Sequence, residues 1–120
     1  MSTELRALIV DDEPLSRRAM QQLLALHPDV RVVASCGDTL EAMPHLSGVD
    51  VVFLDVQLPG ASGLDLARTL TSGGPPFVVF VTAFEAYAVP AFDTEALDYL
   101  QKPVAPERLA KALKIGRAHV

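Results

Sequence analysis

The chain has 120 residues, of which 50% are hydrophobic and 21% are charged. This length fits one domain, and the composition supplies enough apolar residues for a core, which excludes a disordered chain. The formal charge of −5 disfavours direct binding to nucleic acid, because a negative surface repels phosphates. Cys36 is the only cysteine, which excludes an internal disulfide and a cysteine-based metal cage.

The N-terminus leads directly into residues 5–10, which are apolar except for Arg6, without a basic segment or a small-residue cleavage site. No apolar run approaches the roughly 20 residues that cross a bilayer. From the sequence we therefore expect a soluble, cytoplasmic protein.

Short apolar runs alternate with longer amphipathic segments. The runs cover residues 8–10, 30–34, 51–54, 77–81 and 96–100. The first four are typical of strands covered on both faces, and the more polar fifth predicts an edge strand. The alternation predicts an α/β fold in which parallel strands are joined by crossover helices.

The first predicted helix begins at Pro14 and ends before Pro28, because proline fits the first turn of a helix but not its interior. Its core-facing residues at helical spacing are expected to be Leu15, Ala19, Leu23 and Leu26. Asp38 or Thr39 caps a second helix, which Pro44 should kink or shorten. The apolar residues of that helix are Leu40, Met43 and Leu46.

Three further helices are predicted. One covers residues 64–70 and ends at the sequence GGPP, and another covers residues 85–92 and contains Pro90. The last begins at Pro106 and carries Leu109, Ala112 and Leu113. Five βα units of this length leave room for one sheet, covered by helices on both sides.

The final segment, residues 115–120, departs from the pattern that precedes it, because Gly116 interrupts the helical spacing. Its sequence, IGRAHV, resembles the translation of a common sequencing-library adapter. We expect residues 1–114 to form the domain and residues 115–120 to be a non-native tail, with any output domain absent.

Polar residues follow the predicted strands at the end where ligands gather in open α/β sheets. They are Asp11, Asp12, Glu13, Asp55, Thr82 and Lys102. Clustered carboxylates repel one another, and a hard divalent cation relieves that repulsion. Mg²⁺ would take oxygen ligands from Asp12, Asp55 and a backbone carbonyl just after Asp55, with Asp11 holding a metal-bound water.

This set of groups suits phosphoryl transfer. The metal, Lys102 and Thr82 can each contact one phosphoryl oxygen, while Asp55 acts as the nucleophile and forms an acyl phosphate. Taken singly, each residue also fits a structural role, such as a helix cap, a turn or a solvated lysine. Their occurrence at the same end of successive strands favours the functional interpretation.

Four motifs in residues 5–114 resemble the receiver domain of two-component response regulators. They are LIVDDEP at 8–14, VFLDVQLPG at 52–60, FVTA at 80–83 and LDYLQKP at 97–103. The resemblance implies a flavodoxin-like, doubly wound sandwich with a five-stranded parallel sheet in the order 2-1-3-4-5 and five flanking helices. It also implies a phosphohistidine donor on a sensor histidine kinase, with the domain catalysing its own phosphorylation and dephosphorylation.

The resemblance further implies a role for each site residue. Asp55 would be the phosphoacceptor, Asp11 and Asp12 the acidic pair for Mg²⁺, Gln57 the donor of a backbone carbonyl to the metal, Thr82 the switch hydroxyl, Tyr99 the switch aromatic, and Lys102 the phosphate-sensing amine before a cis peptide at Pro103. Movement of Thr82 toward the phosphoryl group would vacate volume for Tyr99 to turn inward. The surface formed by residues 85–92, 96–100 and 106–114 would then respond, and we expect it to form a homodimer.

A narrower resemblance covers residues 82–99, TAFEAYAVPAFDTEALDY, which look like receivers attached to LytTR-type DNA-binding domains. It implies control of transcription by an output domain that follows the last helix. Pro90 departs from the family pattern within the helix expected at residues 85–92.

Three other classes of protein fit the sequence less well. A flavin-binding electron carrier needs a glycine- and hydroxyl-rich phosphate cradle after the first strand, where Asp11 and Asp12 would repel the phosphate. An aspartyl phosphatase is expected to carry a second acid two residues after Asp55, where Gln57 stands. A phosphorylation-independent interaction module predicts the loss of a site residue, and none is lost.

Overall fold

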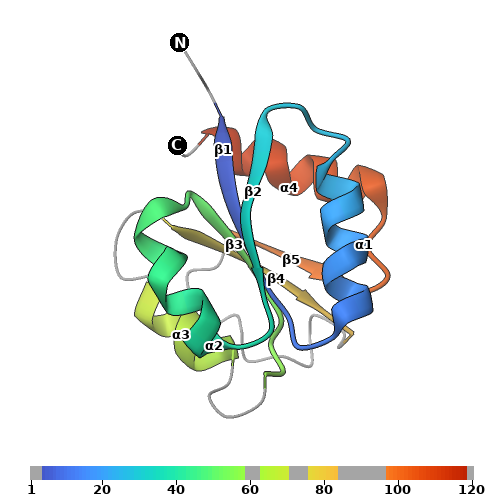
Figure 1. Ribbon diagram of the computed structural model, residues 1–120. Coiled ribbons are helices and arrows are strands. Elements are labelled where there is room, and N and C mark those ends of the chain that lie inside the picture. Colours follow the sequence, from blue (N-terminus) through green and yellow to red (C-terminus); the bar gives the residue numbers. More distant parts are fainter. Residues whose placement is uncertain (1–3, 59–62, 71–75, 84–96, 119–120) are drawn as a thin grey trace.

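The computed structural model describes residues 4–58, 63–70, 76–83 and 97–118, and its five strands form one parallel sheet in the order β2-β1-β3-β4-β5 (Figure 1). The strands are β1 (Leu5–Val10), β2 (Val30–Cys36), β3 (Val51–Leu54), β4 (Phe77–Thr82) and β5 (Asp98–Gln101). The predicted strand order is confirmed, and so is the edge position of the fifth strand.

Burial along the strands explains their composition. Every residue of β3 and all but one residue each of β1 and β4 are buried, as their unbroken apolar sequences indicate. β2 was expected to be covered on both faces, but it lies at the other edge of the sheet, and Arg31 and Val33 are exposed. An edge strand keeps only one strand neighbour, so part of its surface faces solvent.

The helices form a layer on each side of the sheet (Figure 1). They are α1 (Pro14–Leu24), α2 (Thr39–Ala42), the 3₁₀-helix η1 (Met43–Gly48), α3 (Gly63–Leu70) and α4 (Pro106–Ala118). Residues of α1 and α4 share one core cluster with Phe53, and residues of α2 and α3 share a second cluster with Phe80. The helix expected at residues 85–92, including Pro90, lies outside the described residues.

The buried side of α1 differs from the predicted one. Met20 and Leu24 are buried against the sheet, whereas Leu15 is 78% and Leu26 is 69% exposed. The apolar residues between positions 19 and 27 fall into two stripes along the helix, offset from each other by about one residue. Their spacing alone does not decide which stripe packs against the sheet. The stripe centred on Ala19 and Leu23 therefore borders the surface instead of filling the core.

The second helix is as short as Pro44 predicts. The side chain of Asp38 caps it by accepting a hydrogen bond from the amide of Glu41 at 2.8 Å. The α-helix ends at Ala42, and the chain continues as η1, whose first turn contains Pro44. Leu40 and Met43 were expected on an apolar face, but both are exposed and Ala42 is the buried residue.

The last helix does not stop at Gly116. α4 continues to Ala118, Gly116 is buried, and the guanidinium of Arg117 bonds the carboxylate of Asp29 at 2.8 Å. Tertiary contacts outweigh the low helix propensity of one glycine, which costs about 1 kcal/mol. Within the described ranges, no helix has the length and apolar composition needed to cross a membrane.

Candidate functional site

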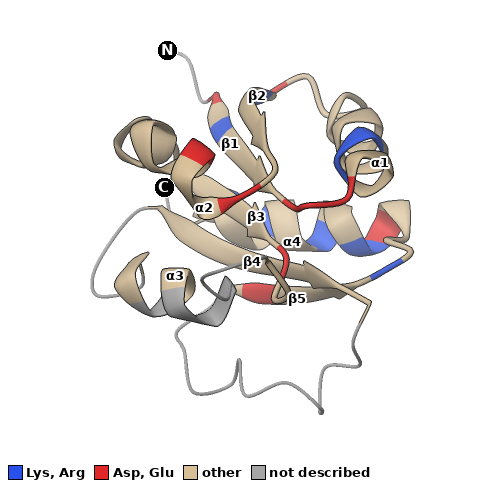
Figure 2. Cartoon of the chain, turned by 60° about the horizontal axis from the view of Figure 1, so that its bottom comes forward, with Lys and Arg blue, Asp and Glu red and all other residues tan. Residues whose placement is uncertain are grey.

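The backbone places two acidic side chains next to each other at the carboxyl ends of β1 and β3. Val10 pairs with Leu54 in the sheet, and the amide of Asp55 donates to the carbonyl of Val10 at 3.0 Å. The amide of Asp11 donates to the carbonyl of Cys36 at 2.9 Å, which ties the same loop to β2. Figure 2 shows the acidic segments that follow β1 and β3 at one edge of the sheet.

These loops form an acidic cluster. One carboxylate oxygen each from Asp11, Asp12 and Asp55 lies within 4.8 Å of the others, with Asp11 and Asp55 buried and Asp12 exposed. The inner oxygens are fixed by their own loops, because Asp11 Oδ1 accepts the amide of Glu13 at 2.9 Å and Asp55 Oδ1 accepts the amide of Gln57 at 3.0 Å. Each buried carboxylate thus keeps its second oxygen for other partners.

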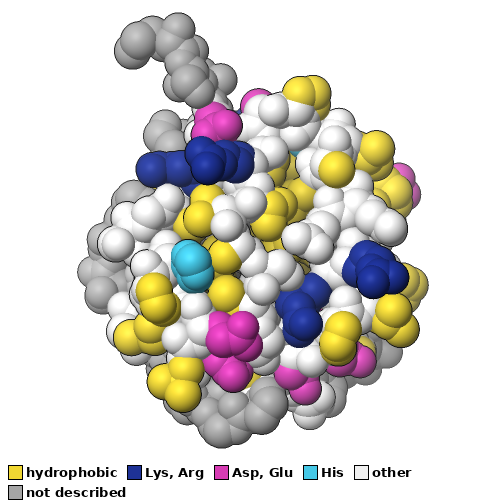
Figure 3. All heavy atoms as spheres, in the orientation of Figure 1, with side chains coloured by type: hydrophobic (Ala, Val, Ile, Leu, Met, Phe, Trp, Pro, Cys, Tyr) yellow, Lys and Arg dark blue, Asp and Glu magenta, His cyan; other side chains and the backbone are white. Residues whose placement is uncertain are grey.

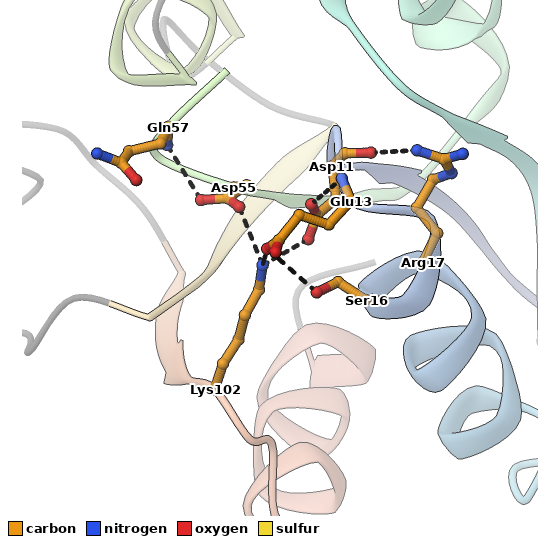
Figure 4. A network of polar contacts seen from close by, with 7 residues as sticks. All are labelled: Asp11, Glu13, Ser16, Arg17, Asp55, Gln57 and Lys102. Atoms are coloured by element: carbon orange, nitrogen blue, oxygen red, sulfur yellow. Dashed lines mark hydrogen bonds and ion pairs between the residues drawn. The ribbon is translucent and has the colours of Figure 1, made fainter. Parts of the chain in front are cut away.

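Lys102 supplies the positive charge at the centre of the cluster. Its Nζ lies 2.8 Å from Asp11 Oδ2, 2.9 Å from Glu13 Oε1 and 3.0 Å from Asp55 Oδ2 (Figure 4). The side chain reaches the acids from the end of β5, and the Lys102–Pro103 peptide bond is cis. One ammonium therefore bridges the ends of β1 and β3 and the start of α1.

The charges of the cluster are mutually dependent. Burial raises the pKa of Asp11 above its usual range, and the hydrogen bond from Lys102 opposes that rise. Burial alone would lower the pKa of Lys102, but its bonds to Asp11, Glu13 and Asp55 outweigh burial and raise that pKa. The hydrogen bond from Lys102 also lowers the pKa of Glu13. Lys102 is therefore a permanent cation at neutral pH.

Thr82 and Tyr99 occupy the neighbouring strands. Thr82 ends β4 and is buried, while Tyr99 lies in β5 opposite Phe80 and is half-buried. The two rings have centroids 6.3 Å apart and are tilted by 47°. Burial raises the pKa of the Tyr99 hydroxyl, and the negative charge of Asp55 adds to this effect. Tyr99 therefore lies near enough to Asp55 for that charge to disfavour ionisation of its hydroxyl.

A hollow opens beside the acids. It has a volume of about 720 Å³ and is lined by Asp12, Glu13, Asp55, Val56, Gln57, Leu58 and Ala83. The available donors are carboxylates and backbone carbonyls, which is the ligand chemistry that Mg²⁺ prefers. The donor set therefore fits a magnesium ion, with Asp11, Asp12, Asp55 and the backbone carbonyl of Gln57 as candidate ligands.

Two contacts of this site were missed by sequence reasoning. Glu13 is predicted in the acidic cluster, with a role at the helix start as the alternative, but its pairing with Lys102 is not predicted; its side chain makes no capping bond. Arg17 was given no role, and its Nη1 donates to the carbonyl of Asp11 at 2.6 Å. The one available signal was the position of both residues beside the acidic motif, at the start of the first helix.

Comparison with known protein families shows which family the chain belongs to. The family model for the response regulator receiver domain matches residues 7–114, and the chain belongs to this family. It is a receiver domain of a response regulator, a component of two-component signalling systems. The predicted five-stranded receiver fold is thereby confirmed.

The chain is also similar in sequence to curated bacterial proteins. The chain is 45% identical over 111 residues to an uncharacterized response regulatory protein of Yersinia pestis, covering 91% of the chain and 47% of that protein. It is 43% identical to the transcriptional regulatory protein BtsR of Salmonella typhi, with 91% and 46% coverage. The chain thus spans about half the length of the curated relatives it matches.

Two solved structures illustrate the match in fold. The response regulatory domain of protein mrkE from Klebsiella pneumoniae is 34% identical, with a TM-score of 0.81 and coverage of 92% of this chain and 93% of that chain. The BeF₃-activated receiver domain of DrrB, a Thermotoga maritima protein, is 25% identical, with a TM-score of 0.78 and coverage of 94% and 97%.

Proposed function

We propose that Asp55 accepts a phosphoryl group from a phosphohistidine of a sensor histidine kinase. A carboxylate oxygen of Asp55 attacks phosphorus, the bond from phosphorus to the imidazole nitrogen breaks, and its electron pair stays on that nitrogen. The product is an acyl phosphate, and attack of water on phosphorus later releases inorganic phosphate and restores the carboxylate. The observation that carries this proposal is the buried Asp55 at the edge of an open hollow, with the Lys102 ammonium at 3.0 Å.

Mg²⁺ is the proposed cofactor, held by Asp11, Asp12, Asp55 and the backbone carbonyl of Gln57. When bound, it supplies positive charge to the phosphoryl oxygens. Side chains of the protein provide the other contacts of the site. Asp11 and Asp55 keep their outer oxygens free of their own loops, and Lys102 would neutralise a phosphoryl oxygen.

The surface next to Lys102 supports docking of the kinase. A groove of about 660 Å³ runs between α1 and the segment after β5, and Lys102, Pro103 and Val104 form one wall. Leu15 on α1 and Leu26 just after this helix are exposed there, and Figure 3 shows hydrophobic side chains at the surface over α1. An apolar face of the kinase seated in this groove would hold its phosphohistidine beside the acidic cluster.

The proposed response runs through Thr82 and Tyr99. Thr82 would donate its hydroxyl to a phosphoryl oxygen, and Tyr99 would turn into the volume that Thr82 leaves. The surface of residues 97–100 and 106–114 would then favour a homodimer, and the part of this predicted surface at residues 85–92 and 96 lies outside the described residues. The transcriptional names of relatives such as BtsR support a transcriptional output, for which a LytTR-type DNA-binding domain is our prediction. Cytoplasmic location also stays a prediction.

Intact-mass measurement tests the proposal. The purified chain is incubated with Mg²⁺ and a small phosphoryl donor such as acetyl phosphate, in parallel with Asp55→Asn. We expect one phosphoryl adduct on the parent chain and none on Asp55→Asn. A folded parent chain that gains no adduct would contradict the proposal and favour a receiver-like module that acts only by protein interaction.

A further inference from the structure

All three hydrogen-bond donors of the Lys102 ammonium are matched by carboxylate partners. Asp11, Glu13 and Asp55 each place one oxygen within 3.0 Å of Nζ (Figure 4). A lysine ammonium has three donors and no acceptor, so these contacts saturate it. Lys102 can therefore bond a phosphoryl oxygen only by giving up one of its carboxylate partners.

Glu13 is the partner that Lys102 can release at least cost. In the metal-free, unphosphorylated protein the side chains of Asp11 and Asp55 are 5% and 7% exposed, so a lost bond to Lys102 would leave a buried charge without compensation. The Glu13 side chain is 62% exposed, and water can replace Lys102 at its carboxylate. Breaking the bond to Glu13 thus frees one donor of Lys102 at the lowest cost in free energy.

The conformation of Glu13 serves this contact and not the helix. Glu13 precedes Pro14 at the start of α1, where a side chain commonly accepts a bond from a helix amide, yet it makes no such bond. Instead the Ser16 hydroxyl donates to Glu13 Oε1 at 3.3 Å, and the same oxygen receives Lys102 Nζ. Ser16 and Lys102 together hold the carboxylate over the site.

From these contacts we infer that Glu13 is a positioning residue, which holds Lys102 against the acidic cluster before phosphorylation and competes with the incoming phosphoryl group for the same ammonium. The inference rests on the proposed phosphorylation of Asp55. When the phosphoryl group arrives, Lys102 transfers one donor from Glu13 to a phosphoryl oxygen, and the Glu13 carboxylate turns to solvent. Glu13 thereby sets how readily the site accepts an anionic group.

The first test observes Lys102 directly in the unphosphorylated protein. The chain has three lysines, and Lys111 and Lys114 are exposed on α4, so NMR of lysine-labelled protein gives one signal from a partly buried ammonium to follow. In Glu13→Gln we expect the Lys102 ammonium signal to shift and its protons to exchange with water about two- to fivefold faster, which matches loss of one exposed ionic contact. An unchanged Lys102 signal would overturn the inference.

Two further variants separate the effect of the contact between Glu13 and Lys102 from the effect of negative charge alone. Glu4→Gln removes a carboxylate that pairs with Arg31 at the opposite end of β1, and we expect Lys102 to be unaffected. Glu13→Asp keeps the charge but withdraws the carboxylate by one methylene, and it should resemble Glu13→Gln. A Glu13→Asp protein that behaves like the parent chain would show that charge alone acts, and it would exclude the positioning role.

The second test measures competition. In saturating Mg²⁺, Glu13→Gln should bind beryllofluoride about two- to fivefold more tightly and react with acetyl phosphate faster by a similar factor. Equal or weaker binding and slower reaction would refute competition. A parent chain without an adduct at Asp55 would contradict the proposed function, whereas the lysine spectra and beryllofluoride binding would still decide the role of Glu13.

Discussion

The backbone amide of Lys102 donates to the carbonyl of Thr82 at 2.8 Å. This bond fixes the two residues proposed to contact the phosphoryl group at adjacent strand ends. The same pairing of β4 with β5 also sets Tyr99 opposite Phe80. A change at Thr82 can therefore reach Tyr99 through packing between two strands and needs no rearrangement of the sheet.

We predict that Thr82→Ala uncouples Tyr99 from the site. The chain has no tryptophan and two tyrosines, so Tyr87→Phe leaves Tyr99 as the single tyrosine fluorophore. In that background, Mg²⁺ and beryllofluoride should change the Tyr99 fluorescence of the parent protein but not of Thr82→Ala. Thr82→Ser keeps the hydroxyl and is the matched control. An equal response in Thr82→Ala would argue against the Thr82 switch.

Lys102→Met should make the fold depend on a divalent cation. The substitution leaves Asp11 and Asp55 buried without their shared cation, and we expect a loss of about 3 kcal/mol in the free energy of unfolding in metal-free buffer. Mg²⁺ should then raise the melting temperature of Lys102→Met more than that of the parent protein, because it restores the missing positive charge. A variant as stable as the parent protein without Mg²⁺ would refute this prediction.

Two leucines of α1 test which side of the helix is buried. Leu24→Ala should lower the free energy of unfolding by about 3 kcal/mol, because Leu24 is fully buried. Leu15→Ala should change it by less than about 0.5 kcal/mol, since Leu15 is exposed. Urea unfolding of the two variants gives the comparison. A larger loss of stability in Leu15→Ala than in Leu24→Ala would instead support the buried face that helical spacing predicts, which includes Leu15.

The ion pair between Asp98 and Arg108 predicts a dependence of stability on pH. Arg108 Nη2 lies 2.6 Å from Asp98 Oδ1, and Nη1 lies 2.9 Å from Asp98 Oδ2. Burial alone would raise the pKa of Asp98, but the bonds from Arg108 and from the Tyr99 amide outweigh burial and lower it. The folded state therefore gains stability above the unfolded pKa, near 3.8, and loses it as pH falls through the lower folded pKa.

Asp98→Asn should consequently be less stable than the parent protein by about 1 kcal/mol at pH 6, with the difference shrinking below pH 4. Chemical unfolding across this pH range measures the effect. Arg108→Gln and the double variant complete a mutant cycle that isolates the pair. A difference that stays constant down to pH 3 would show that the carboxylate charge is not responsible.

The positions of the strands and the residues that meet at one edge of the sheet follow from the amino-acid pattern itself, whereas the predicted strand order came from the resemblance to receiver domains. Apolar runs mark the strands, and in a parallel sheet the residue after each run lies at the same edge, so the pattern of runs is enough to group Asp11, Asp55, Thr82 and Lys102. Pro14, Pro44 and Pro106 likewise set where helices begin or shorten, because proline acts through local geometry.

Features that depend on distant partners follow from the tertiary fold instead. Periodicity allows two apolar stripes on α1, and contact with the sheet selects Met20 and Leu24. Glu13 and Lys102 are 89 positions apart, so their ion pair exists only because the sheet order brings the ends of β1 and β5 toward the same site. Gly116 stays helical for a similar reason. The contact of Arg117 with Asp29 and the burial of the helix stabilise this conformation by more than the low helix propensity of one glycine costs. Local chemistry fixes the elements, whereas long-range packing fixes their faces and their charge partners.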